Sequence, residues 1–99
     1  MMLTPKQEKI IDYLYVNNGA TFNVCKTIEE LQELSLALTQ KLTKPSIDNT
    51  QAVIDEIGDV MLRLEILKKM FPKDKIKERI DLKLSKWETY IDHKRFKNI

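Results

Sequence analysis

The stretch of sequence that decides the fold runs from Asp48 to Met70 and reads DNTQAVIDEIGDVMLRLEILKKM. Apolar residues recur in it every three or four positions, which is the period of an amphipathic helix and not the alternation of a strand. Lys44-Pro45-Ser46 before it and Phe71-Pro72 after it mark its ends, because proline does not fit inside a helix. We therefore predict a helix here, with a main apolar stripe of Val53, Ile57, Val60, Met61, Leu64 and Leu67.

Three further helices are predicted around this one. Thr4-Pro5 combines a capping residue with a first-turn proline, and Asn17-Asn18-Gly19 ends the helix that begins there. Two other segments carry apolar stripes of helical period, formed by Ile28, Leu31, Leu34, Leu38 and Leu42 and by Ile76, Ile80, Leu84, Trp87 and Ile91. The predicted helices cover about residues 5–17, 22–43, 48–70 and 73–95.

The composition favours a single all-α domain over residues 1–99, folded as a four-helix bundle, since only two Gly and three Pro occur. A chain of 99 residues buries a modest core, so assembly into an oligomer is expected. The net charge of +2 is too small to indicate a nucleic-acid polymer as a partner. No signal peptide or membrane-spanning run is visible, so we expect a soluble, cytoplasmic protein. One cysteine, Cys25, and one distant histidine, His93, make neither a disulfide nor a zinc site.

Two segments of the sequence repeat each other. Residues 28–34, IEELQEL, and residues 54–60, IDEIGDV, match position by position as apolar, acid, Glu, apolar, small or polar, acid, apolar. The match continues with Leu36 and Leu38 against Leu62 and Leu64. Two helices are therefore expected to carry the same surface.

Successive residues of a helix are rotated by about 100°, so each repeat places its pair of acids at one edge of its apolar stripe. Two packed helices can point these four carboxylates at one spot, where they would repel each other and lose hydration. We therefore expect a cation among them, and an all-oxygen ligand set suits Mg²⁺ or Mn²⁺. The four acids are Glu30, Glu33, Glu56 and Asp59.

Two other interpretations apply to the same residues. If the helix began at Thr27, Thr27 and Glu30 would form a capping box, and Glu30 would be structural. Isolated acid pairs on helices are also common on solvated faces. In addition, Leu62 and Ile66 lie beside Asp59 on the helical wheel, so the third helix is apolar on two sides. We expect its second side to contact another subunit.

The two acid motifs, Glu30-Leu31-Gln32-Glu33 and Glu56-Ile57-Gly58-Asp59, resemble the ExxE and ExxD signature of the MazG-like and dimeric dUTPase superfamily. The entry segment Lys26-Thr27-Ile28-Glu29-Glu30-Leu31 resembles that family as well, and the specific match spans roughly residues 26 to 67. The resemblance implies an all-α fold and assembly into dimers or tetramers. It also implies Mg²⁺-dependent hydrolysis of a nucleoside triphosphate to the monophosphate and pyrophosphate, as in sanitation of the nucleotide pool.

The resemblance also implies roles for individual residues. The four motif acids would hold Mg²⁺, for which Mn²⁺ can substitute, and Glu29 or Asp55 would orient the attacking water. Arg79, Lys83 and Lys86 share one face of the fourth helix and are candidates for binding phosphates, although a solvated basic face would look the same.

Two other functions fit parts of this pattern. A helical oligomeric adaptor or regulator would keep the metal-binding frame without turnover. A carboxylate-bridged di-iron bundle would need Glu-x-x-His pairs, and the sole histidine, His93, is far from both motifs.

Overall fold

A computed structural model describes the backbone of residues 1–97 and the side chains of residues 1–94. It contains four α-helices and, within residues 1–97, no strand: α1 (Pro5–Asn18), α2 (Ala20–Thr43), α3 (Thr50–Lys68) and α4 (Lys73–Lys97). The all-α class and the four helices are therefore confirmed, with boundaries close to those expected from the sequence. Among the described residues, no helix has both the length and the hydropathy needed to cross a bilayer.

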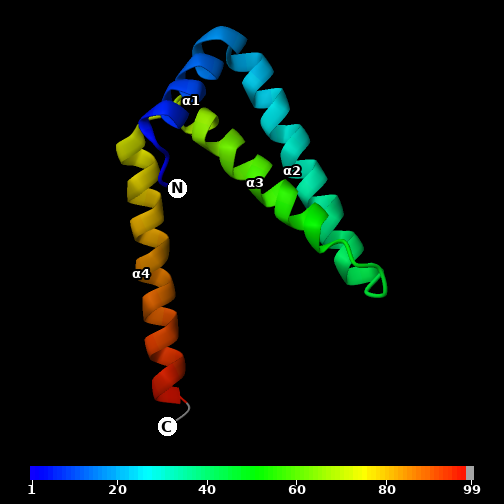
Figure 1. Cartoon of the computed structure of the whole chain (residues 1–99). Coiled ribbons are helices and arrows are strands. Elements are labelled where there is room, and N and C mark those ends of the chain that lie inside the picture. Colours follow the sequence, from blue (N-terminus) through cyan, green and yellow to red (C-terminus); the bar gives the residue numbers. More distant parts are fainter. Residues whose placement is uncertain (98–99) are drawn as a thin grey trace.

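The start of α1 is fixed by a capping box, and its end by one glycine. The Thr4 hydroxyl accepts a hydrogen bond from the backbone N–H of Gln7 (3.2 Å), and the Gln7 side chain accepts one from the N–H of Thr4 (2.9 Å). Gly19 alone connects α1 to α2, with φ of +81°, a region that other residues adopt only with strain. The chain therefore turns sharply from α1 into α2 at a single residue, as Figure 1 shows.

Helices α2 and α3 form an antiparallel hairpin and lie side by side along their length (Figure 1). The tip of the hairpin is closed by the Asn49 side-chain amide, which donates to the carbonyl of Ala37 (2.9 Å). On α2, the side that packs within the chain carries Thr27, Leu34 and Ala37. The expected apolar stripe of α2 thus overlaps its packing side only at Leu34, and the other four members are exposed: Ile28, Leu31, Leu38 and Leu42.

Helix α1 packs across the end of the hairpin, against α3. Ile11 of α1 and Ile66 of α3 are 4% and 2% exposed, and Lys69 Nζ lies 2.6 Å from Asp12 Oδ1. The buried Asn23 side chain donates to the carbonyl of Leu14 (3.4 Å), which fixes α1 against α2. The expectation that Ile66 contacts another subunit is therefore wrong, because α1 of the same chain covers it, whereas Leu62 on the same side of α3 is exposed.

Helix α4 leaves the other three at its first turn and extends away from them (Figure 1). Ile76 is half-buried at the root of this helix, but every side chain from Lys77 to Lys94 is exposed. Its apolar stripe has no partner within the described chain. The resulting shape is open, with a radius of gyration of 17.6 Å, whereas a compact domain of this length has about 13 Å.

Candidate metal centre

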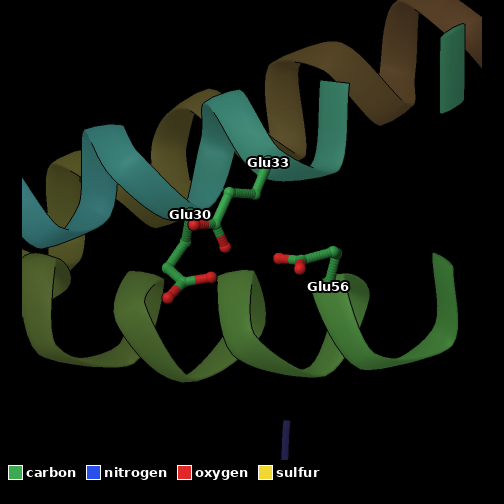
Figure 2. A group of neighbouring side chains, drawn as sticks. All are labelled: Glu30, Glu33 and Glu56. Atoms are coloured by element: carbon green, nitrogen blue, oxygen red, sulfur yellow. The ribbon is translucent and has the colours of Figure 1, made fainter. Parts of the chain in front are cut away.

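Three carboxylates meet between α2 and α3. Glu30 and Glu33 extend from α2 and Glu56 from α3, and Figure 2 shows the three side chains pointing toward one another in the space between these helices. One oxygen of each lies within 4.8 Å of one from each of the others. The sequence repeat explains this meeting, because Glu30 and Glu56 occupy equivalent positions on two antiparallel helices that pack through the same side.

Two of these oxygens lack partners. Glu30 Oε2 and Glu56 Oε2 are both buried, and neither accepts a hydrogen bond. A buried carboxylate oxygen without a donor or a cation carries a large desolvation cost, so such groups in proteins are normally paired or bind a metal. The donor set is all oxygen and converges on one point, which fits a hard divalent cation such as Mg²⁺ or Mn²⁺.

The same crowding changes the protonation of the acids. Burial raises the pKa of Glu56 to about 7, with further contributions from the negative charge of Glu33, a side-chain hydrogen bond with Glu30, and the negative charges of Glu30 and Asp59. Burial also raises the pKa of Glu30, with repulsion from Glu33 and Asp59 next in size. Without a cation, the site therefore holds a proton near neutral pH that ordinary glutamates have already lost.

The metal-free protein should lose stability as pH rises from about 4.5 to about 7. In this window the unfolded chain has released the Glu56 proton while the folded chain still holds it, since the pKa is raised from 4.5 to about 7 on folding. The folded state then binds more protons, so the free energy of unfolding falls with pH. The raised pKa of Glu30 acts in the same direction. Urea melts in a chelator between pH 4.5 and 8 measure this slope.

A matched variant tests whether the site causes the slope. Glu56→Gln removes the titrating group and should flatten the fall in the free energy of unfolding with pH. Glu65→Gln is the control, because it alters an acid of the same helix that pairs with Lys68 (2.9 Å), and the fall with pH should remain. A free energy of unfolding that rises across this window would contradict the raised pKa of the site.

The other acids expected at the site lie around this group. Asp59 is exposed and outside the group of three, but its charge raises the pKa of both Glu30 and Glu56. Glu29 is exposed and pairs with Lys26 (3.2 Å), and Asp55 is exposed and accepts a hydrogen bond from Gln51 (2.8 Å). Neither Glu29 nor Asp55 belongs to the converging group.

The capping-box interpretation of Glu30 is excluded. Helix α2 begins at Ala20, so Thr27 lies inside the helix, where its hydroxyl donates to the carbonyl of Asn23 (2.7 Å). Glu30 is therefore available to the site.

The three candidate phosphate-binding residues are not brought to the acids within one subunit. Arg79, Lys83 and Lys86 are exposed on α4, which points away from the α2–α3 hairpin (Figure 1). Within a single chain, these cations and the carboxylates belong to separate surfaces.

A cleft of about 420 Å³ opens beside the carboxylates, between α1 and α3, with Glu30 and Asp59 in its wall. Most of its lining is apolar, but it also contains Arg63, whose Nη1 is buried without a hydrogen-bond partner. The sequence interpretation missed Arg63. The available signal was its spacing, four residues after Asp59, which places both on one side of α3. The apolar lining consists of Leu3, Ile10, Ile11, Leu14, Leu62 and Ile66.

Comparison of this chain with protein-family models, curated proteins and solved structures gave no match.

Proposed function

We propose that the protein is a Mg²⁺-dependent nucleoside triphosphate pyrophosphohydrolase, which releases pyrophosphate and a nucleoside monophosphate. The observation that carries the proposal is the convergence of Glu30, Glu33 and Glu56, with two buried oxygens that lack any partner. The reaction itself is inferred from the resemblance of the two acid motifs to the MazG-like superfamily. Sanitation of the nucleotide pool is the corresponding role.

In this proposal, Glu30, Glu33 and Glu56 bind the cation directly, and Asp59 adds negative charge at the edge of the site. Bound Mg²⁺ would neutralise the triphosphate and lower the pKa of a water molecule. The chain contributes the ionised carboxylates, so cation binding should displace the proton that Glu56 holds near neutral pH. Exposed Glu29 and Asp55 are the candidates for orienting the attacking water.

The cleft beside the carboxylates is the proposed site for the nucleoside. Its apolar walls suit the faces of a base, and the unpartnered Nη1 of Arg63 can donate to a carbonyl or phosphate oxygen of the substrate. Glu30 and Asp59 line the same cleft, so a nucleoside there would have its phosphates next to the cation.

A pyrophosphate-release assay on a panel of canonical and modified deoxynucleoside triphosphates, with Mg²⁺ or Mn²⁺, tests the proposal. We expect turnover of at least one triphosphate that depends on the divalent cation and stops when a chelator is added. Absence of turnover across the whole panel would favour the alternative, a helical oligomeric adaptor or regulator that keeps the metal-binding frame.

The proposal also includes a location and partners. The enzyme would act in the cytoplasm on free nucleotides, not on a nucleic-acid polymer, and would work as a homo-oligomer. In an oligomer, Arg79, Lys83 and Lys86 of one copy would be the candidates for binding the phosphates held by another.

A further inference from the structure

The cleft between α1 and α3 has polar side chains of two kinds. Glu30 and Asp59 are acceptors, and they lie at the acid site. Gln7 and Arg63 are the other polar residues of the lining, and the rest of it is apolar. A nucleotide in this cleft would place its phosphates beside the acids. Its base would then meet only Gln7 and Arg63 as hydrogen-bonding side chains.

Arg63 brings to the cleft a donor that the described chain leaves unused. Its Nη1 is buried and has no hydrogen-bond partner. A buried donor without an acceptor is costly, and a guanidinium group donates but never accepts. Arg63 also follows Glu56 by seven residues, which places it about 10 Å further along α3. That position suits the base of a nucleotide whose phosphates lie at the acids.

Gln7 offers a donor from the opposite wall of the cleft. Its side-chain oxygen accepts a hydrogen bond from the backbone N–H of Thr4 (2.9 Å), in the capping box that begins α1. This bond fixes the orientation of the amide, because the N–H of Thr4 must face the oxygen and not the nitrogen. The atom of Gln7 that remains for a ligand is therefore the amide nitrogen, which donates.

From these two donors we propose that the cleft holds a base subsite that selects bases with a keto group over bases with an amino group. The inference rests on the proposed function, since it takes a nucleotide as the ligand. The pairing edge of every base mixes donors and acceptors, so two donors do not match it. On the opposite edge, a keto base presents only acceptors, at O4 of a pyrimidine or at O6 and N7 of a purine. An amino group at position 4 or 6 is itself a donor and would leave a buried donor of the protein unpaired.

Two pairs of substrates test this selection, because the members of each pair share the sugar and the ring and differ in a keto or an amino group. dUTP is compared with dCTP, and dITP with dATP, by kcat/KM for pyrophosphate release. The keto member of each pair should be favoured at least about 10-fold, because an unpaired buried donor costs that much. Calorimetric titration with dUMP, dCMP, dIMP and dAMP measures the same preference as an affinity, without turnover.

Gln7→Glu is the sharpest variant, because it puts an acceptor where the donor was. Glutamate also serves in a capping box, so α1 should keep its start, and thermal melts check this. The keto preference within each pair should fall at least about 10-fold. Any general effect of the added charge on phosphate binding cancels in this ratio. Gln40→Glu is the control, since it makes the same change at an exposed residue of α2 outside the cleft lining, and should leave the ratio as in wild type.

Arg63→Leu removes the other donor and should also reduce the keto preference. The proposal is wrong if wild type does not discriminate within either pair, or if Gln7→Glu leaves the ratio unchanged. It is also wrong if Arg63→Leu lowers kcat/KM equally for both members of each pair, since Arg63 would then bind phosphate. If Arg63→Leu does not fold, Gln7→Glu still decides. Equal turnover within both pairs would leave the proposed reaction standing. Turnover of no triphosphate would count against the reaction, and the titrations with monophosphates would still decide on the base subsite.

Discussion

Replacement of Glu56 by Gln should lower pyrophosphate release by more than about 100-fold, since loss of groups one shell further from a metal already costs about 10–100-fold. Glu56 is the sole member of the converging group supplied by α3, and its Oε2 is buried without a partner. Glutamine keeps the size of the side chain and removes one negative charge. The expected defect is therefore in cation binding and turnover, with the helical content unchanged.

Steady-state assays at several Mg²⁺ concentrations measure the effect of Glu56→Gln. Part of the activity should return at high Mg²⁺, because the remaining acids still attract the cation. Glu65→Gln is the control, since it makes the same change on the same helix at a residue that pairs with Lys68 (2.9 Å). If Glu56→Gln turned over substrate as wild type does, the carboxylate group would not be the active site.

Millimolar Mg²⁺ should stabilise the wild-type fold by about 1–3 kcal/mol, because a ligand that binds only the folded state adds its binding free energy to folding. The cation would relieve the repulsion among Glu30, Glu33 and Glu56 and give their buried oxygens a partner. For a chain of this size, that range corresponds to a rise in melting temperature of about 4–24 °C. Thermal melts at pH 8, with and without Mg²⁺, measure it.

A second variant tests whether the fourth acid belongs to the site. Asp59 raises the pKa of Glu30 and Glu56 through its charge, so Asp59→Asn should raise the melting temperature of the metal-free protein and reduce the response to Mg²⁺. Asp55→Asn changes an exposed acid of the same helix that accepts a hydrogen bond from Gln51 (2.8 Å), and should do neither. Identical melts for the two variants would show that Asp59 acts as an ordinary surface acid.

The sequence was sufficient to predict the four helices, because the residues that begin and end a helix act locally. Thr4 and Pro5 begin α1 as the capping residue and first-turn proline that the sequence indicated, and Gly19 ends it. The packing sides were harder to predict. Apolar stripes were expected to be the buried sides, but α2 packs through Thr27 and Ala37, and most of its stripe is exposed. Periodicity shows that a helix has an apolar side and does not show whether its own chain or another one covers that side.

For the candidate site, the repeat selected four acids, and the structure brings three of them together while Asp59 lies outside the group. Glu30, Glu33 and Glu56 converge because two similar helices pack as an antiparallel pair, which their matching patterns indicated. The packing of α1 against α3 could not be predicted from such a pattern. Ile66 is covered by Ile11 and its neighbours from α1, a contact between residues far apart in the sequence that no local pattern specifies. The cleft and Arg63 depend on that contact and were missed with it.

Gly19 has a mechanical consequence for the cleft. This single residue connects α1 to α2. Helix α1 forms one wall of the cleft, and α2 contributes Glu30 to another wall. Helix α1 has 14 residues and acts as a lever of about 21 Å, at 1.5 Å of rise per residue. A change of a few degrees in the torsion angles of Gly19 would move the free end of that lever by more than an ångström. The width of the cleft therefore depends on the torsion angles of Gly19, remote from the side chains that line it, as well as on the Asp12–Lys69 ion pair and the Asn23–Leu14 hydrogen bond that hold α1 in place.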